Sequence, residues 1–225
     1  MEESGWLNIN KPKNWQSTKV VSIIKKITKA KKVGHGGTLD MLANGVLPVC
    51  INKATKQVES MMDHEKRYLF HLTFGELRTT NDAEGDIIEK NDFIPNLEIV
   101  KSILNSFIGI IKQIPPVYSA IKINGKRASD LVRNGRNVEL KARDILIKNI
   151  KINGFINDNT IEFVVDCGRG CYIRSLGVDI AKAVGAIGYI SKIERQKVGN
   201  FLLEDSLNIE ENFDLEKIKK NLIIL

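Results

Sequence analysis

Short strand-like segments dominate this chain and limit the folds that it can adopt. Residues 67–74 alternate between apolar and polar side chains, which is the pattern of a half-buried strand. The apolar set on one face comprises Tyr68, Phe70, Leu72 and Phe74. Further strand-like runs lie at residues 5–10, 117–123, 144–152 and 160–167. Because strands outnumber helices and adjacent ones are close in sequence, we expect an α+β fold with a mixed, mostly antiparallel central sheet flanked by helices.

Helical periodicity appears in fewer places. In residues 17–29 the apolar side chains recur at helical spacing, and Ser17 can cap the first turn. Other helices are expected at about residues 100–107 and 175–184. A short helix should follow the basic turn at residues 125–127.

Composition excludes several classes of protein. The chain has 225 residues, of which 43% are hydrophobic and 27% charged, the balance of a globular protein. It contains no run of about 18 apolar residues, so we expect no membrane span. The first residues lack a basic-then-apolar signal segment, so we expect a cytoplasmic protein. The three cysteines fit a reducing compartment. Cys167 and Cys171 have no second Cys/His pair at suitable spacing, so we expect no metal site.

Positive charge is concentrated near the N-terminus. The chain carries a formal net charge of +7, and residues 11–32 contain eight lysines without any acidic residue. A solvated helix face explains part of this pattern. An acidic polymer such as RNA explains the missing carboxylates better.

The most distinctive segment spans residues 34–48 and reads GHGGTLDMLANGVLP. Its glycines allow the backbone to adopt positive φ angles and to approach a ligand closely. We expect a glycine-rich loop with a short turn over residues 32–48. A phosphate-binding loop is the first alternative, but the Gly-Lys-Ser/Thr ending is missing and Asp40 would repel phosphate. Taken alone, such glycines are most often a structural turn.

This segment resembles the catalytic motif of the TruB family of pseudouridine synthases. Four other segments resemble motifs of the same family in the same order: residues 7–12, 66–68, 113–122 and 170–175. The resemblance implies a pseudouridine synthase fold in a single catalytic domain over residues 1–225. It also implies an RNA-binding thumb insertion at about residues 113–140. Only about thirty residues follow Arg195, so we expect no room for the C-terminal PUA domain of many relatives.

The resemblance implies that the chain isomerises uridine to pseudouridine in the T-loop of tRNA, at position 55. The target base would be flipped into a pocket. Asp40 matches the family's catalytic nucleophile, and Arg174 matches the arginine that keeps this carboxylate ionised despite burial. Tyr68 matches the tyrosine that stacks on the base and is a candidate for the late proton abstraction.

Further contacts follow from the same resemblance. Tyr172 and Ile193 match substrate-contacting positions, although Ile193 could equally be a core residue. His35 matches a histidine that displaces the target nucleotide, although a histidine between glycines could also cap a turn. The expected phosphate contacts are Lys11, Lys122, Lys126 and Arg127. The isomerisation needs no cofactor, and we expect a monomer that binds the tRNA T-arm without an obligatory protein partner.

Three positions depart from the family motif. Gly36 replaces a common threonine, Met41 a common proline, and Asn44 a common threonine. These changes concern the rigidity of the loop rather than the carboxylate of Asp40. Two alternative functions remain open: a non-catalytic RNA-binding or tRNA-folding chaperone, and a guide-dependent synthase of the dyskerin type acting on ribosomal RNA.

Overall fold

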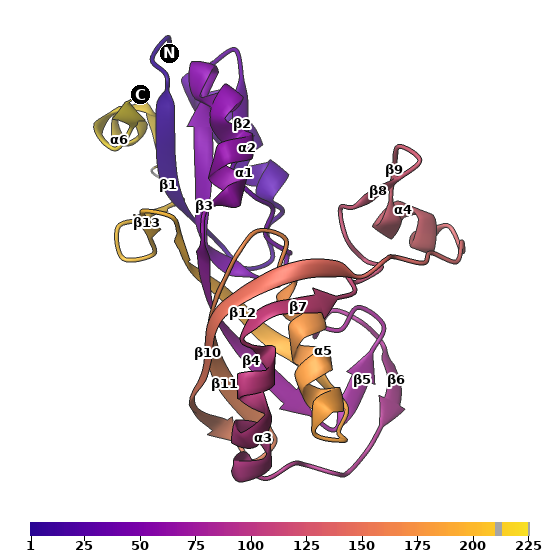
Figure 1. The fold of residues 1–225 in the computed structure, drawn as a ribbon. Helices are drawn as coiled ribbons and strands as arrows, with labels where there is room; N and C mark the ends of the chain where they lie inside the picture. Colours follow the sequence, from indigo (N-terminus) through magenta and orange to yellow (C-terminus); the bar gives the residue numbers. More distant parts are fainter. Residues whose placement is uncertain (210–212, 225) are drawn as a thin grey trace. The chain divides into compact units, whose positions relative to one another are not determined.

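The computed structural model describes residues 1–209 and 213–224, which fall into two compact units (Figure 1). Unit 1 comprises Met1–Leu69 and Ile193–Leu225, and unit 2 comprises Phe70–Lys192. Strands β4 (Lys66–Phe74) and β12 (Gly188–Val198) run from one unit into the other. The helices of the described residues are too short or too polar to cross a bilayer.

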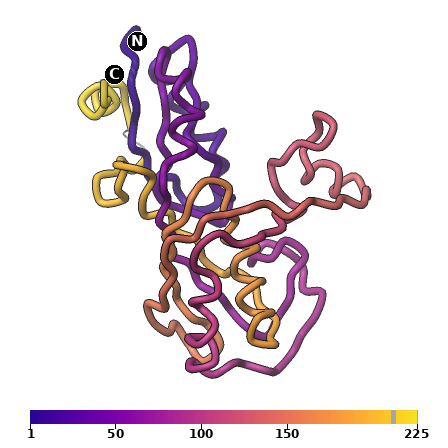
Figure 2. The backbone as a smooth tube through the Cα atoms, viewed as in Figure 1, coloured from indigo at the N-terminus to yellow at the C-terminus, as the bar shows by residue number. Residues whose placement is uncertain are grey.

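Unit 1 is built on a mixed sheet in the order β14–β1–β3–β12. Its central pair is antiparallel, with Gly5 opposite Ile51 and Lys11 opposite Gly45. β14 runs parallel to β1, and β12 runs parallel to β3, so segments from both ends of the chain lie side by side (Figure 2). The strands in this unit are β1 (Gly5–Lys11), β2 (Val33–His35), β3 (Asn44–Ile51), β13 (Phe201–Leu202), β14 (Leu207–Asn208) and β15 (Ile223–Ile224).

The principal helix of unit 1 is α1 (Ser17–Thr28), which buries Val20 and Ile24 on one face. This confirms the predicted helix, but the prediction that Ser17 caps it is wrong. Gln16 occupies the cap position and its side chain makes no capping bond, while the Ser17 hydroxyl is bonded to Leu39. The smaller helices are a 3-10 turn (Asn52–Gln57), α2 (Val58–Asp63) and α6 (Leu215–Lys220).

The expected loop over residues 32–48 is only partly correct. β2 pairs antiparallel with the end of β3, so that Gly34 faces Cys50 and His35 faces Val49. The first residues of β3 also belong to the sheet. The backbone bonds to a neighbouring strand therefore override the glycine content of this segment.

Unit 2 contains a second run of strands in the order β12–β4–β11–β10–β7. Both outer pairs, β11 with β10 and β10 with β7, are antiparallel. The predicted alternation in β4 is confirmed, since Phe70, Leu72 and Phe74 are buried and Phe70 stacks on Phe163 at 5.1 Å between ring centroids. The strands of this unit include β5 (Glu76–Arg78), β6 (Ile87–Lys90), β7 (Gly109–Gln113), β10 (Arg143–Asn157) and β11 (Thr160–Cys167). Its helices include α3 (Leu97–Leu104), a 3-10 turn (Asn105–Phe107) and α5 (Ile173–Ala183).

The predicted strand at residues 117–123 is wrong except for its last two residues. Only β8 (Lys122–Ile123) forms, and it pairs with β9 (Lys126–Arg127) in a hairpin. Asn124 and Gly125 turn this hairpin with φ angles of 49° and 82°, as short hairpin turns require. Upstream, the carbonyl oxygens of Ser119 and Ile121 accept bonds from the start of α4 (Ala128–Arg133) rather than from a strand.

Candidate active site

Asp40 lies in the loop between β2 and β3, entirely within unit 1. Its side chain is half-buried, whereas Leu39 and Leu42 are buried and Met41 is exposed. The two buried leucines fasten the loop to the core on either side of the carboxylate. Asp40 is therefore held at the edge of the protein interior, where a substrate can reach it.

Two segments of unit 1 hold the backbone on both sides of Asp40. The Ser17 hydroxyl accepts a hydrogen bond from the Leu39 N–H at 2.9 Å and donates one to the Leu39 carbonyl at 3.1 Å. The Asn14 N–H donates to the Met41 carbonyl at 2.7 Å. A hydroxyl can donate and accept at once, so one serine at the start of α1 satisfies both backbone groups of Leu39. These bonds hold the loop backbone on both sides of Asp40.

Two of the departures from the family motif have local explanations. A Cβ atom on Gly36 would lie 2.4 Å from the Cγ atom of Met61, so the Met61 side chain fills the space of the missing threonine. Asn44 donates a hydrogen bond from Nδ2 to Glu194 at 3.3 Å. Met41 is 41% exposed, and no contact explains its replacement of proline.

His35 stands in β2 with its ring half-buried. Its Nδ1 atom is buried and has no hydrogen-bond partner among the described residues. Burial lowers the pKa of His35 below its usual value of 6.5, and the nearby positive charge of Arg195 lowers it further. The ring is therefore neutral near pH 7.

The depressed pKa of His35 predicts a pH-dependent stability. Between the folded-state pKa and 6.5 the unfolded chain binds more protons, so the free energy of unfolding should decrease as the pH falls below about 7. Replacing His35→Gln should weaken this dependence. Urea unfolding of both proteins at pH 7.5 and 5.5 measures how much the free energy of unfolding decreases between the two pH values. An equal decrease in the wild type and in His35→Gln would contradict the assignment to His35.

Tyr68 and Ile193 also belong to unit 1. Tyr68 lies in β4 and is 8% exposed, and Ile193 lies in β12 and is 3% exposed. Both side chains are thus packed into the protein rather than spread on its surface. Such burial suits an apolar wall of a base pocket and equally suits a core position.

In unit 2, Arg174 lies in the first turn of α5 and is 4% exposed. Its guanidinium donates to the carbonyl oxygens of Thr80 at 3.1 Å and Tyr118 at 2.9 Å. Its Nε atom lies 3.5 Å from Oδ2 of Asp82. These contacts orient the buried cation.

Asp82 is a buried carboxylate that the sequence analysis did not single out. It is 2% exposed and accepts hydrogen bonds from the Thr80 hydroxyl and from the Glu84 N–H. It also pairs with Ile190 in an isolated bridge. The only signal in the sequence is a Thr-Thr-Asn-Asp run after a strand, which is as typical of an exposed turn.

Tyr172 precedes α5, where the side chain of Gln113 holds its backbone. The Tyr172 N–H donates to Oε1 of Gln113 at 2.8 Å, and the Tyr172 carbonyl accepts from Nε2 at 3.2 Å. Gln113 is 1% exposed. The last residue of β7 thereby fixes the position from which both Tyr172 and Arg174 extend.

The sequence-predicted residues therefore fall into two sets. His35, Asp40, Tyr68 and Ile193 belong to unit 1, and Tyr172 and Arg174 belong to unit 2. Each set is fixed by contacts within its own unit. No group of three or more potential metal ligands gathers in the described parts of the chain.

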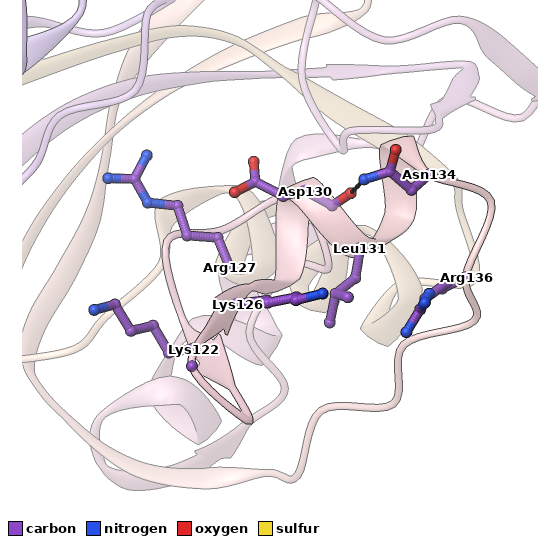
Figure 3. A pocket seen from close by; sticks show the side chains of 8 residues that line it. Lys122, Lys126, Arg127, Asp130, Leu131, Asn134 and Arg136 are labelled. Carbon is purple, nitrogen blue, oxygen red and sulfur yellow. Dashed lines mark hydrogen bonds between the residues drawn. The ribbon is translucent and has the colours of Figure 1, made fainter.

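The predicted phosphate contacts differ in their surroundings. Lys122, Lys126 and Arg127 are exposed and line an open hollow beside α4, together with Arg136 (Figure 3). Asp130 is the single acidic residue of that lining. Lys11, by contrast, is 0% exposed. Its amine donates to the carbonyl oxygens of Pro12 at 2.9 Å and Trp15 at 2.7 Å.

Comparison with known proteins gives a consistent result. Residues 25–173 match the model of the N-terminal domain of TruB family pseudouridylate synthases. The chain is 42% identical over 207 residues to a tRNA pseudouridine synthase B of Ehrlichia canis (strain Jake), covering 92% of the chain and 69% of that relative. It is 44% identical over 206 residues to a tRNA pseudouridine synthase B of Brucella abortus (strain 2308), covering 92% and 64%.

Solved structures resemble the fold as well. One chain of a crystal structure of a Cbf5–Nop10–Gar1 complex superposes with a TM-score of 0.72 at 29% identity, covering 96% of this chain and 55% of the other. A chain of an H/ACA ribonucleoprotein bound to a substrate RNA gives a TM-score of 0.65 at 28% identity, covering 91% and 50%.

Proposed function

This chain belongs to the TruB family of pseudouridylate synthases, and we propose that it isomerises uridine to pseudouridine at position 55 in the T-loop of tRNA. The relatives with this activity in their names align over nearly the whole chain. The observation that carries the proposal is the loop between β2 and β3 in unit 1. It presents the half-buried carboxylate of Asp40 between Leu39 and Met41, whose backbones are held by hydrogen bonds.

The reaction is an isomerisation, so uridine and pseudouridine contain the same atoms and differ only in the bond that joins the base to the ribose. The glycosidic bond from C1′ of the ribose to N1 of the base breaks, the base turns, and a bond from C1′ to C5 forms. The C5 proton leaves, and N1 takes up a proton. A nucleophile, a base-binding surface and a proton acceptor are sufficient for these steps.

The roles are assigned as follows. Asp40, ionised, is the nucleophile. Tyr68 stacks on the everted base, and its oxygen, as the phenolate, accepts the C5 proton in the last step and becomes the neutral phenol. Arg174 supplies a permanent positive charge for the reacting carboxylate and substrate, because guanidinium keeps its proton at any relevant pH.

The remaining contacts concern binding. Neutral His35 and Tyr172 contact the target nucleotide, with Ile193 as an apolar wall. Lys122, Lys126 and Arg127 bind phosphates of the T-arm. We leave Lys11 out of this set, because its amine is buried and already bonded to two carbonyl oxygens.

Helix α1 offers a further phosphate-binding face. Lys25, Lys26 and Lys29 are exposed and form no ion pair within residues 1–209 and 213–224. The segment around them has no acidic side chain to offset their charge. This face therefore suits the backbone of an RNA.

Neutralising Lys25, Lys26 and Lys29 to glutamine should weaken tRNA binding and its dependence on salt. Each phosphate contact adds roughly 0.7–0.9 to the slope of log Kd against log salt, so the slope should decrease by about 2. Fluorescence titration with tRNA at several salt concentrations measures it.

The matched control removes three lysines that are exposed but already paired with carboxylates. Lys90 pairs with Glu76, Lys101 with Glu98 and Lys112 with Asp144. Changing these three lysines to glutamine should leave the slope within about 0.5 of the original. Equal effects of the two triple variants would refute a specific role of α1.

The experiment that tests the function uses the purified chain alone. Incubation with an unmodified tRNA transcript should produce pseudouridine at position 55. A guide-dependent synthase is the second candidate, favoured by the structural similarity to a chain of an H/ACA ribonucleoprotein. That candidate, like a non-catalytic chaperone, predicts no product on free tRNA.

A further inference from the structure

Arg195 is among the most deeply buried charged residues described here. It lies in β12, is 1% exposed, and stands in register with Gly45 of β3. A guanidinium retains its charge on burial. Removing that charge from water is costly unless its N–H groups find acceptors, so the acceptors of Arg195 show what its burial stabilises.

Those acceptors lie on the two sides of Asp40. The Nε atom of Arg195 donates to the Val46 carbonyl at 2.7 Å, and Nη2 donates to the Gly37 carbonyl at 3.0 Å. Val46 is the third residue of β3, the strand that follows the loop, and Gly37 lies in the loop just after β2. One rigid, planar group therefore ties together the two ends of the segment that carries Asp40.

The main chain of Arg195 shapes the same loop. Gly45 has a φ angle of +107°, and a Cβ atom there would lie 2.3 Å from the carbonyl oxygen of Arg195. Only glycine fits this conformation and this distance. Gly45, at the end of the loop, thus packs against the backbone of Arg195. The side chain of Arg195 binds Gly37, at the start of the loop.

We propose that Arg195 is a positioning residue that closes the loop of residues 37–46 and so fixes where the Asp40 carboxylate is presented. It acts through the loop backbone. The effect on catalysis rests on the proposed function, whereas the hydrogen bonds from Arg195 to Gly37 and Val46 do not depend on it. Lysine cannot replace it, because a single amine on a flexible stem does not offer two donors in a fixed plane.

The test compares Arg195→Lys and Arg195→Gln with the wild type. Hydrogen exchange should show the amides of residues 38–44 exchanging at least about tenfold faster in both variants, with exchange in β1 unchanged. The single-turnover rate on saturating tRNA should fall about 10- to 100-fold, the scale of a small misplacement of a reacting group. The Kd for tRNA should change less than about threefold.

The matched control is Lys197→Gln on the same strand, a residue whose amine lies 4.0 Å from Glu65 in a partly exposed ion pair. It should match the wild type in every measurement. If Arg195→Gln does not fold, the measurements on Arg195→Lys alone test the proposal, since that variant retains the positive charge.

Three results would overturn the proposal: unchanged exchange in the loop, faster exchange throughout unit 1, or a faster-exchanging loop with an unchanged rate. An inactive wild type would refute the proposed function instead. The exchange measurement would then still decide whether Arg195 closes the loop.

Discussion

Asp40→Asn is expected to abolish pseudouridine formation while leaving tRNA binding almost unchanged. The amide is nearly the same size as the carboxylate but is not a nucleophile. The bonds that hold the loop come from Ser17 and Asn14 to the backbone of Leu39 and Met41. These backbone bonds are unchanged by the substitution and should keep the loop in place.

The expected loss in rate is at least about 10⁴-fold, as when other enzymes lose a nucleophile. Release of tritium from tRNA labelled at C5 of uridine measures turnover, because that hydrogen leaves in the reaction. The Kd should stay within about twofold, and the melting temperature within a few degrees. Product formation by the variant at a rate near that of the wild type would refute the nucleophile assignment.

The control for Asp40→Asn is Asp205→Asn, which makes the same chemical change at an exposed position of unit 1. It should retain full activity. If both variants lost activity equally, the loss would reflect a general effect of charge rather than the chemistry of one residue.

The sequence predicted the elements whose signal is local. The alternation in β4, the periodicity of α1 and the helix ending near Gly185 each involve residues a few positions apart. Side-chain period alone determines which face of such an element is buried. These predictions were confirmed, as was the α+β class with a mixed central sheet.

Other features depend on partners that are distant in the chain. β2 is a strand only because β3 lies beside it, and Ser17 is bonded to Leu39 instead of capping its helix. The contact between Arg195 and Gly37 joins residues 158 positions apart. No periodicity in one sequence encodes such pairs.

The candidate site shows the same division. Asp40, Tyr68 and Arg174 were predicted because each lies in a motif that resembles the family's, and their roles stay predictions. Asp82 lies in no such motif, and its burial depends on the fold of the loop after β5. Lys11 was expected to contact phosphate, but its amine is buried and donates to the carbonyl oxygens of Pro12 and Trp15.

Asp82→Asn should be the most destabilising conservative change in unit 2. The side chains of Arg174 and Asp82 are 5% and 3% exposed, and the substitution leaves the guanidinium without this anion. Removing one partner of a buried pair costs about 3–5 kcal/mol. We expect about 3 kcal/mol, since Arg174 keeps its bonds to Thr80 and Tyr118. Asparagine retains Oδ1 for the Thr80 and Glu84 donors, so the change isolates the charge.

A double variant separates stability from catalysis. Adding Arg174→Met to Asp82→Asn removes the cation as well as the anion, and replacing both charges of a buried pair is often near neutral. Urea unfolding should therefore show most of the lost free energy restored. Pseudouridine formation should remain at least about 10²-fold below the wild type, because the proposed role of Arg174 needs its charge.

The control for this pair is Asp144→Asn, which breaks the ion pair with Lys112 at 2.8 Å, where the side chains are 61% and 75% exposed. A surface pair of this kind contributes about 0–1 kcal/mol, so stability should barely change. Should Asp82→Asn prove equally harmless, the buried pair would not be what fixes Arg174. A double variant with wild-type activity would remove Arg174 from the catalytic set, whatever its effect on stability.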